Sequence, residues 1–219
     1  LKDNLCYKGH KVSASSKILD GFESLYTATA VQRLLDQDAI IIGRLNCDEF
    51  AMGSSNENSS FGPVINARNI RCVPGGSSGG SATAVAAGLC TAALGSDTGG
   101  SIRQPASFTG TYGVKPSYGR ISRYGLIAYA SSFDQIGPFT NDIEDAALLT
   151  EVMAGIDAFD ATVASQKVED YSVPGSERKN LKIAMIGESL EMEGLDPEIK
   201  AQLEAMTTQL EANGHDVEK

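Results

Sequence analysis

Apolar residues recur along the chain at spacings typical of helices that alternate with short strands. Residues 27–36 carry apolar side chains at helical spacing, which predicts an amphipathic helix. Its apolar face is expected to consist of Ala28, Val31, Leu34 and Leu35. The apolar run 39–42 then predicts a short buried strand, and Gly43 lets the chain leave the sheet.

The same pattern predicts three further helices. Residues 81–89 are small and apolar on all sides, so this helix is expected to be buried. Residues 141–154 begin with Asn and Asp and are followed by Gly155, as is typical of a capped helix. The third helix, 196–212, has a proline in its first turn.

Strands are predicted between these helices. Residues 91–97 and 181–187 read as buried strands, and a further strand is expected to begin near residue 215. Residues 110–140 are rich in Gly and Pro and predict short extended pieces joined by turns, while the polar residues 161–180 predict a surface connection. The alternation indicates an α/β fold with a mixed, largely parallel sheet that helices cover on both faces.

Composition supports a globular protein of ordinary size. The 219 residues are 42% hydrophobic and 21% charged, which is enough apolar material for a core and argues against disorder. The chain opens on Leu1 and closes where a strand begins. We therefore expect residues 1–219 to be part of a single domain that is truncated at both ends.

Charge and cysteine usage narrow the class of protein. The net charge of −10 disfavours a surface that grips nucleic acid, and it is typical of an acidic cytoplasmic protein. The cysteines lack metal-binding spacing, which indicates reduced thiols, no zinc cluster and no metal site. They are Cys6, Cys47, Cys72 and Cys90. No apolar run is long enough to span a bilayer.

The stretch 73–90, VPGGSSGGSATAVAAGLC, is the first candidate for chemistry. A flexible linker would not continue into an apolar helix. A phosphate loop would need Lys after the last Gly, where Ser81 stands, and the acidic residue of a dinucleotide site is missing. A catalytic interpretation remains, because tight glycine turns can direct several N–H groups at one point.

In a second glycine turn, 95–105, Ser101 follows directly after a pair of glycines. A plain turn leading into a helix explains this spacing equally well. The flanking residues Asp97 and Arg103 favour a structural ion pair that holds the loop rather than direct catalysis.

A nucleophilic serine needs a base, and the chain offers few candidates. The two histidines, His10 and His215, lie in polar stretches and are interpreted as surface residues. A desolvated lysine can be neutral near pH 7, but the residues alone do not choose between Lys2 and Lys115.

Several long stretches together resemble the amidase signature family. They are LKDN at 1–4, the Gly/Ser segment 74–89 and the segment 93–122, in the order and at the spacing of that family. Residues 44–69 and 123–149 are similar to the glutamine-hydrolysing subunits of tRNA-dependent amidotransferases within it.

The resemblance implies a Ser–Ser–Lys triad. Ser101 would be the nucleophile that forms an acyl-ester, Ser77 the bridging hydroxyl and Lys2 the base. It also implies a cis peptide bond between Gly76 and Ser77. An oxyanion hole would be formed by the backbone N–H groups of Thr98, Gly99, Gly100 and Ser101.

The function that the resemblance implies is hydrolysis of glutamine to supply ammonia for the conversion of Glu-tRNA(Gln) to Gln-tRNA(Gln). It implies partner subunits B and C, with ATP and magnesium used at a partner, no cofactor in this chain, and tRNA held mainly by the partner. The alternative hypotheses are a stand-alone amidase for small amides, a phosphate-binding domain or a non-catalytic scaffold subunit.

Overall fold

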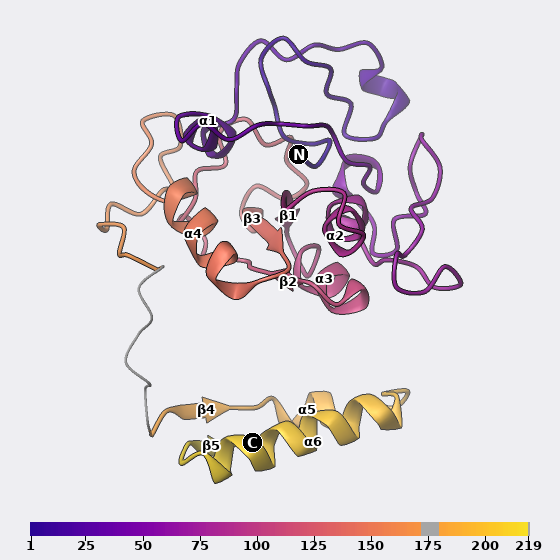
Figure 1. Cartoon of the computed structure of the whole chain (residues 1–219), viewed down its shortest axis with the longest axis vertical. Coiled ribbons are helices and arrows are strands. Elements are labelled where there is room, and N and C mark those ends of the chain that lie inside the picture. The colour runs from indigo at the N-terminus through magenta and orange to yellow at the C-terminus, as the bar shows by residue number, and fades with distance from the viewer. Residues whose placement is uncertain (172–179, 219) are drawn as a thin grey trace. The chain divides into compact units, whose positions relative to one another are not determined.

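The computed structural model describes residues 1–171 and 180–218 of the chain (Figure 1). It divides into two compact units, Leu1–Ser172 and Val173–Lys219. Each unit has its own secondary structure, and the α/β class that the sequence predicts is confirmed. That both units belong to one truncated domain stays a prediction.

The first unit is built around a three-stranded sheet in the order β1-β3-β2. Strand β1 (Ala92–Asp97) pairs with β3 (Gln135–Thr140), which pairs with β2 (Tyr112–Gly113). Strand β1 confirms the buried strand predicted at 91–97. Both pairings are antiparallel, so the largely parallel sheet expected from the alternation of elements is wrong for this unit.

Helices cover both faces of this sheet, as predicted. Figure 1 shows α2 (Gly79–Ala86) and α3 (Arg103–Thr109) on one side of the strands and α4 (Ile143–Met153) on the other. Helix α1 (Thr29–Leu35) packs against α4. The helices predicted at 27–36, 81–89 and 141–154 are confirmed with shifted ends. Short 3-10 helices lie at Lys17–Leu19 (η1) and Glu49–Ala51 (η2).

The core lies on both faces of strands β1 and β3, because successive side chains point to opposite sides of a strand. Leu94 and Ile136 belong to one cluster of buried apolar side chains, together with the predicted face of α1. Ala93 and Phe139 belong to a second cluster under α2 and α3. Packing is close enough that a Cβ at Gly137 would lie 1.9 Å from the Val114 carbonyl oxygen.

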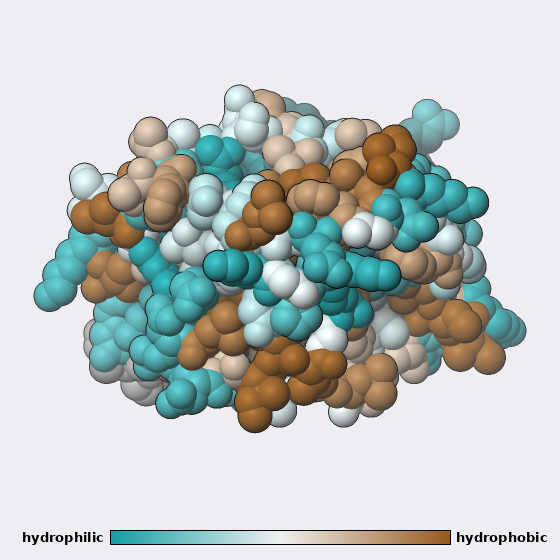
Figure 2. All heavy atoms as spheres, turned by 90° about the horizontal axis from the view of Figure 1, so that it is seen from above, coloured by the Kyte–Doolittle hydropathy of each residue, from teal (hydrophilic) through white to brown (hydrophobic). Residues whose placement is uncertain are grey.

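The predicted buried strand at 39–42 is wrong. The segment is irregular, and the side chains of Ile40 and Ile42 are 85% and 72% exposed. The start of the chain pairs with the residues that follow this segment. The Leu1 amine donates to the Gly43 carbonyl, and Lys2 forms a β-bridge with Leu45. Figure 2 shows apolar side chains at several places on one face of the molecule, so an apolar run by itself does not establish burial.

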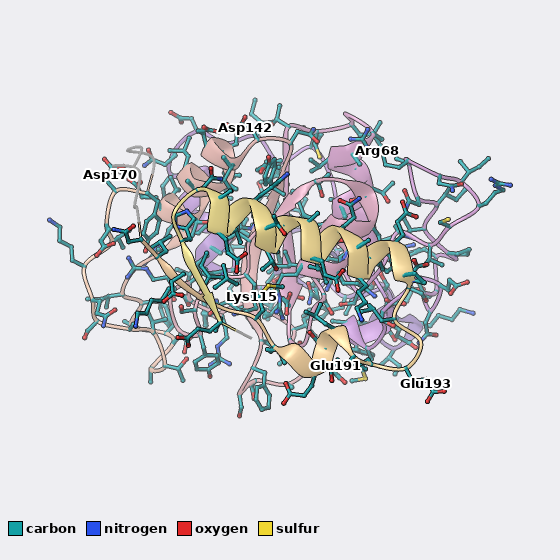
Figure 3. The ribbon with its side chains drawn as sticks, turned by 90° about the horizontal axis from the view of Figure 1, so that it is seen from below. Arg68, Lys115, Asp142, Asp170, Glu191 and Glu193 are labelled. Atoms are coloured by element: carbon teal, nitrogen blue, oxygen red, sulfur yellow. The ribbon has the colours of Figure 1, made fainter. Side chains whose placement is uncertain are left out.

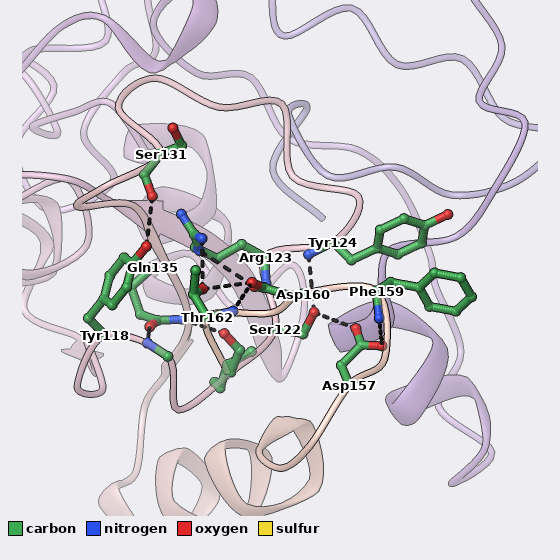
Figure 4. A network of polar contacts seen from close by, with 12 residues as sticks. Tyr118, Ser122, Arg123, Tyr124, Ser131, Gln135, Asp157, Phe159, Asp160 and Thr162 are labelled. Atoms are coloured by element: carbon green, nitrogen blue, oxygen red, sulfur yellow. Dashed lines mark hydrogen bonds and ion pairs between the residues drawn. The ribbon is translucent and has the colours of Figure 1, made fainter. Parts of the chain in front are cut away.

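Two aspartates that follow α4 hold the segment 118–124 against it (Figure 4). Asp157 accepts hydrogen bonds from the hydroxyls of Thr29 and Ser122. Asp160 accepts from the backbone N–H of Arg123 at 2.8 Å and lies 3.5 Å from the Arg123 guanidinium. Burial of both carboxylates would raise their pKa, but hydrogen bonds lower it overall: those from Ser122 and Thr29 to Asp157, and those from Thr162 and the Arg123 N–H to Asp160.

The predicted surface connection at 161–180 lies partly outside the described residues. Residues 161–171 contain no helix or strand, as predicted. They are nevertheless anchored, because the Arg120 guanidinium donates to the carbonyl oxygens of Gln166 and Lys167. Residues 172–179 lie outside the described part of the chain.

The second unit is a small α/β element. Strand β4 (Lys182–Ala184) pairs in parallel with β5 (Asp216–Glu218), and helices α5 (Gly187–Leu190) and α6 (Pro197–Ala212) lie between them in the sequence. The helix predicted at 196–212 and the strand predicted near 215 are confirmed. The burial predicted for the strand at 181–187 is wrong, because Lys182 and Ala184 are exposed in a sheet of only two strands.

Candidate active site

Lys2 is held beside strand β1 by the backbone on both of its sides. Its N–H donates to the Leu94 carbonyl at 3.0 Å, and the residue bridges in parallel to Leu45. Its side chain is fully buried. Figure 3 labels Lys115, the other lysine that the sequence left open. Its Nζ donates to the carbonyl oxygen of its neighbour Pro116 instead.

The Lys2 amine is surrounded by serine oxygens. Its Nζ lies 2.6 Å from Ser77 Oγ and 2.9 Å from Ser96 Oγ. Within the described residues, no carboxylate forms an ion pair with this amine. Burial therefore lowers the pKa of Lys2 from 10.5 to about 8, although the nearby Cys47 and Asp48 raise it in part.

Ser77 lies in the glycine-rich stretch, which is a buried loop and not a linker. The peptide bond between Gly76 and Ser77 is cis, as the family resemblance implies. The Gly76 N–H donates to Gln104 Oε1 at 3.0 Å, and a Cβ at Gly76 would lie 2.1 Å from Asp48 Oδ2. A larger residue than glycine would therefore displace the loop that carries Ser77.

The turn around Ser101 is organised by Asp97. The buried carboxylate accepts from the backbone N–H groups of Gly100 at 2.8 Å and Ile102 at 3.0 Å, and it pairs with the Arg103 guanidinium at 3.1 Å. The structural ion pair predicted from the sequence is confirmed. Burial would raise the pKa of Asp97, but the hydrogen bonds from Arg103 and the backbone lower it overall.

Three backbone N–H groups of this turn are left free. Among the described residues, the N–H groups of Thr98, Gly99 and Ser101 make no hydrogen bond. The N–H of Gly100, also expected in an oxyanion hole, donates instead to Asp97. The Thr98 hydroxyl donates to the buried Asp134 carboxylate, which fixes the side chain next to the free N–H groups.

The structure brings Lys2 and Ser77 into direct contact and places Ser101 next to them through the backbone. The Ser101 carbonyl oxygen accepts from the Ser78 N–H at 3.3 Å. Within the described part of the chain, the half-buried Ser101 hydroxyl forms no hydrogen bond, so none joins it to the Ser77 hydroxyl.

Two residues of this site were not predicted. Ser96 contacts the Lys2 amine, and Asp134 holds Thr98. A signal for Ser96 existed, because it is a serine in a strand whose neighbouring positions are all buried. Asp134 carries no such signal, since it lies among the turns before β3.

A buried lysine, a glycine-rich serine loop and a second serine turn define this site as that of an amidase. The chain belongs to the amidase family, whose model matches residues 1–219. Within that family it is similar to the A-type subunits of glutamyl-tRNA(Gln) amidotransferases. It is 56% identical to the one from Acidobacterium capsulatum over 99% of this chain, and 54% identical to the one from Salinibacter ruber over 100%. The chain spans 46% and 43% of those relatives, so about half of their length or less.

Solved structures agree with this placement. The crystal structure of the A-type subunit from Thermotoga maritima is 44% identical, with a TM-score of 0.89 over 99% of this chain and 48% of that one. A 6-aminohexanoate cyclic dimer hydrolase is 30% identical, with a TM-score of 0.91 over 100% of this chain and 47% of that one. The fold is thus common to the family, and the sequence identity is higher to the amidotransferase subunits than to the hydrolase.

Proposed function

We propose that this chain carries the amidase centre of a glutamine-hydrolysing subunit that supplies ammonia for the conversion of Glu-tRNA(Gln) to Gln-tRNA(Gln). The observation that carries the proposal is the buried contact between the Lys2 amine and the Ser77 hydroxyl, next to a turn with free N–H groups around Ser101. The names of the relatives supply the amidotransferase step at Glu-tRNA(Gln), and the family resemblance implies glutamine as the source of ammonia.

In the proposed reaction, Lys2 is the base, Ser77 relays protons and Ser101 is the nucleophile. Neutral Lys2 takes the Ser77 proton while Ser77 takes the Ser101 proton, and Ser101 Oγ bonds to the side-chain amide carbon of glutamine. The carbon–nitrogen bond then breaks, and the proton returns from Lys2 through Ser77 to the departing ammonia. Water hydrolyses the glutamyl ester by the same relay and releases glutamate.

The hydroxyls of Ser77 and Ser101 need not be hydrogen-bonded beforehand. Catalytic hydrogen bonds commonly tighten only when the substrate is bound. Among the described residues, the Ser101 hydroxyl has no hydrogen-bond partner. It therefore breaks no existing hydrogen bond when it donates to Ser77.

The oxyanion of the tetrahedral intermediate would be bound by the free N–H groups of Thr98, Gly99 and Ser101. One such donor typically contributes about 2.7–4 kcal/mol to the transition state. The Gly100 N–H would not donate to the oxyanion. Its hydrogen bond to Asp97 would hold the turn in shape instead.

The remaining steps would belong to partner subunits B and C. One of them would use ATP and magnesium to amidate glutamate attached to tRNA, and no cofactor is assigned to this chain. The net charge of −10 favours an arrangement in which the partner makes most contacts with tRNA. We also propose a cytoplasmic location, because free cysteines and an acidic composition suit a reducing compartment.

None of the described helices could span a lipid bilayer.

A stand-alone amidase is the second candidate. It is favoured by the likeness to a peptide amidase solved with the competitive inhibitor chymostatin, which is 34% identical with a TM-score of 0.83 over 99% of this chain and 46% of that one. Hydrolysis of simple amides that is unaffected by partner subunits would support this alternative over the ammonia-supplying role.

The proposal is tested with the full-length protein in complex with its partners. We expect Ser101→Ala and Lys2→Arg to abolish glutamine-dependent amidation of Glu-tRNA(Gln), because one lacks the nucleophile and the other cannot lose its proton. Amidation driven by added ammonium should persist in both variants. Glutamine-dependent turnover in either variant would contradict the roles assigned here.

A further inference from the structure

Ser96 contacts the Lys2 amine through two of its oxygens. Lys2 Nζ lies 2.9 Å from Ser96 Oγ and 3.5 Å from the Ser96 carbonyl oxygen, while the third contact is Ser77 Oγ at 2.6 Å. All three residues are buried. The amine therefore meets two oxygens of one residue on β1 and one oxygen of the relay serine.

A neutral amine has two hydrogens and one lone pair, whereas an ammonium has three hydrogens. A carbonyl oxygen can only accept a hydrogen bond, so Lys2 donates one of its amine hydrogens to the Ser96 carbonyl. The Ser96 hydroxyl also accepts from Asn4 Nδ2 at 2.9 Å and has one further lone pair for Lys2. With both amine hydrogens directed to Ser96, the lone pair is directed to Ser77.

Ser96 itself is fixed on both sides of its backbone. The Ser78 hydroxyl donates to the Ser96 carbonyl at 3.0 Å and accepts from the Ser96 N–H at 3.3 Å. Ser96 also pairs with Ile136 within the sheet. The serine next to the relay serine thus holds the strand residue that orients the amine.

We propose that Ser96 is a positioning residue for the reaction, which orients the Lys2 amine so that its lone pair faces Ser77 and accepts the proton from it. This inference rests on the proposed function. After proton transfer, the same three oxygens accept the three hydrogens of the ammonium, so the charged form is accommodated without a carboxylate in contact.

Other ionisable groups surround the amine and contribute to its titration without contacting it. They are Cys47, Asp48, Asp97 and Asp134. Each of them raises the pKa of Lys2, and each is left intact by a substitution at Ser96. A shift in the titration of Lys2 in such a variant is therefore assigned to the lost serine hydroxyl.

The test compares Ser96→Thr with Ser96→Val in the full-length protein in complex with its partners. Threonine and valine have the same shape, so the pair isolates the hydroxyl even if Ser96→Ala does not fold. Relative to Ser96→Thr, we expect Ser96→Val to lower kcat for glutamine hydrolysis by about 10- to 100-fold, with KM within about two-fold. The acid limb of kcat/KM should also move to lower pH, because the ammonium loses an acceptor.

Thr150→Val is the matched control. Among the described residues, its buried hydroxyl contacts the Ala146 carbonyl of α4 alone, so removing it should change neither kcat nor the pH profile. Equal kcat and equal pH profiles for the Ser96→Thr and Ser96→Val variants would overturn the inference.

The two proposals fail separately. If Ser101→Ala and Lys2→Arg are inactive while Ser96→Val behaves as Ser96→Thr does, the inference about Ser96 is overturned and the proposed function stands. If Ser101→Ala and Lys2→Arg keep glutamine-dependent turnover, the proposed function is overturned, and the inference with it.

Discussion

At the scale of single residues, the site depends on a buried lysine that no carboxylate contacts within residues 1–171 and 180–218. Desolvation disfavours the ammonium, and the serine oxygens around it restore only part of the lost hydration. With a pKa of about 8, about one Lys2 side chain in ten is neutral at pH 7, which makes the amine available as a base.

This burial predicts a pH dependence of stability. The pKa of Lys2 is about 8 in the folded chain, against 10.5 for a lysine in water, so between these values the unfolded state binds the extra proton. The free energy of unfolding should therefore rise between pH 8 and 10.5, by about 3 kcal/mol relative to the Lys2→Met variant.

Chemical denaturation of both proteins across this pH range measures that difference. The contributions of the tyrosines and of Cys6, Cys72 and Cys90 cancel in the comparison, since both proteins carry them, whereas the titration of Cys47 is coupled to Lys2 and changes with it. A difference that stays constant from pH 8 to 10.5 would show that the amine is not desolvated in the folded state.

At the scale of elements, strand β1 supports both the Lys2 amine and the turn that carries Ser101. Ser96 near its end contacts Lys2, and Asp97 at its end holds the turn that carries Ser101. Helix α2 approaches so closely that a Cβ at Gly80 would lie 2.3 Å from the Asn46 carbonyl oxygen. Gly76 and Gly80 thus permit close contact between segments, whereas Gly99 and Gly100 of the Ser101 turn have open space around them and Gly100 has a positive φ of 133°.

The Asp97 turn predicts unequal effects for the two members of its ion pair. Asp97→Asn removes the charge from a buried acceptor of several N–H groups and should destabilise the protein by about 3 kcal/mol. Arg103→Gln removes a side chain that is 55% exposed and should cost under about 1 kcal/mol. Urea denaturation of the two variants measures both effects, and equal losses would contradict this role of Asp97.

At the scale of the whole molecule, the sequence predicted most of the helices, while the catalytic roles of Lys2, Ser77 and Ser101 stay a prediction and Ser96 and Asp134 were not predicted. Periodicity and caps located α1, α4 and α6 because each presents an apolar face or an end signal, and α2 was located by a run of small apolar residues. The family resemblance named Lys2 and Ser77, which the residues alone could not select.

What the sequence did not predict depends on contacts between distant segments. Strand β3 lies in a Gly- and Pro-rich region and is recognisable only through its pairing with β1. The segment 39–42 has a strand-like composition but no pairing partner in the described chain. Ser96 became a candidate only when β1 was placed beside residues 1–4, because 94 positions separate it from Lys2 in the sequence.

The most direct test of the account is the pH dependence of the rate at which a fluorophosphonate labels the full-length protein. We predict a single labelled serine, Ser101, with a rate that rises through pH 8 as Lys2 loses its proton and that falls strongly in Lys2→Arg. No labelling, labelling that persists in Ser101→Ala, or a rate that is the same in Lys2→Arg would contradict the claim that Lys2 activates Ser101 through Ser77.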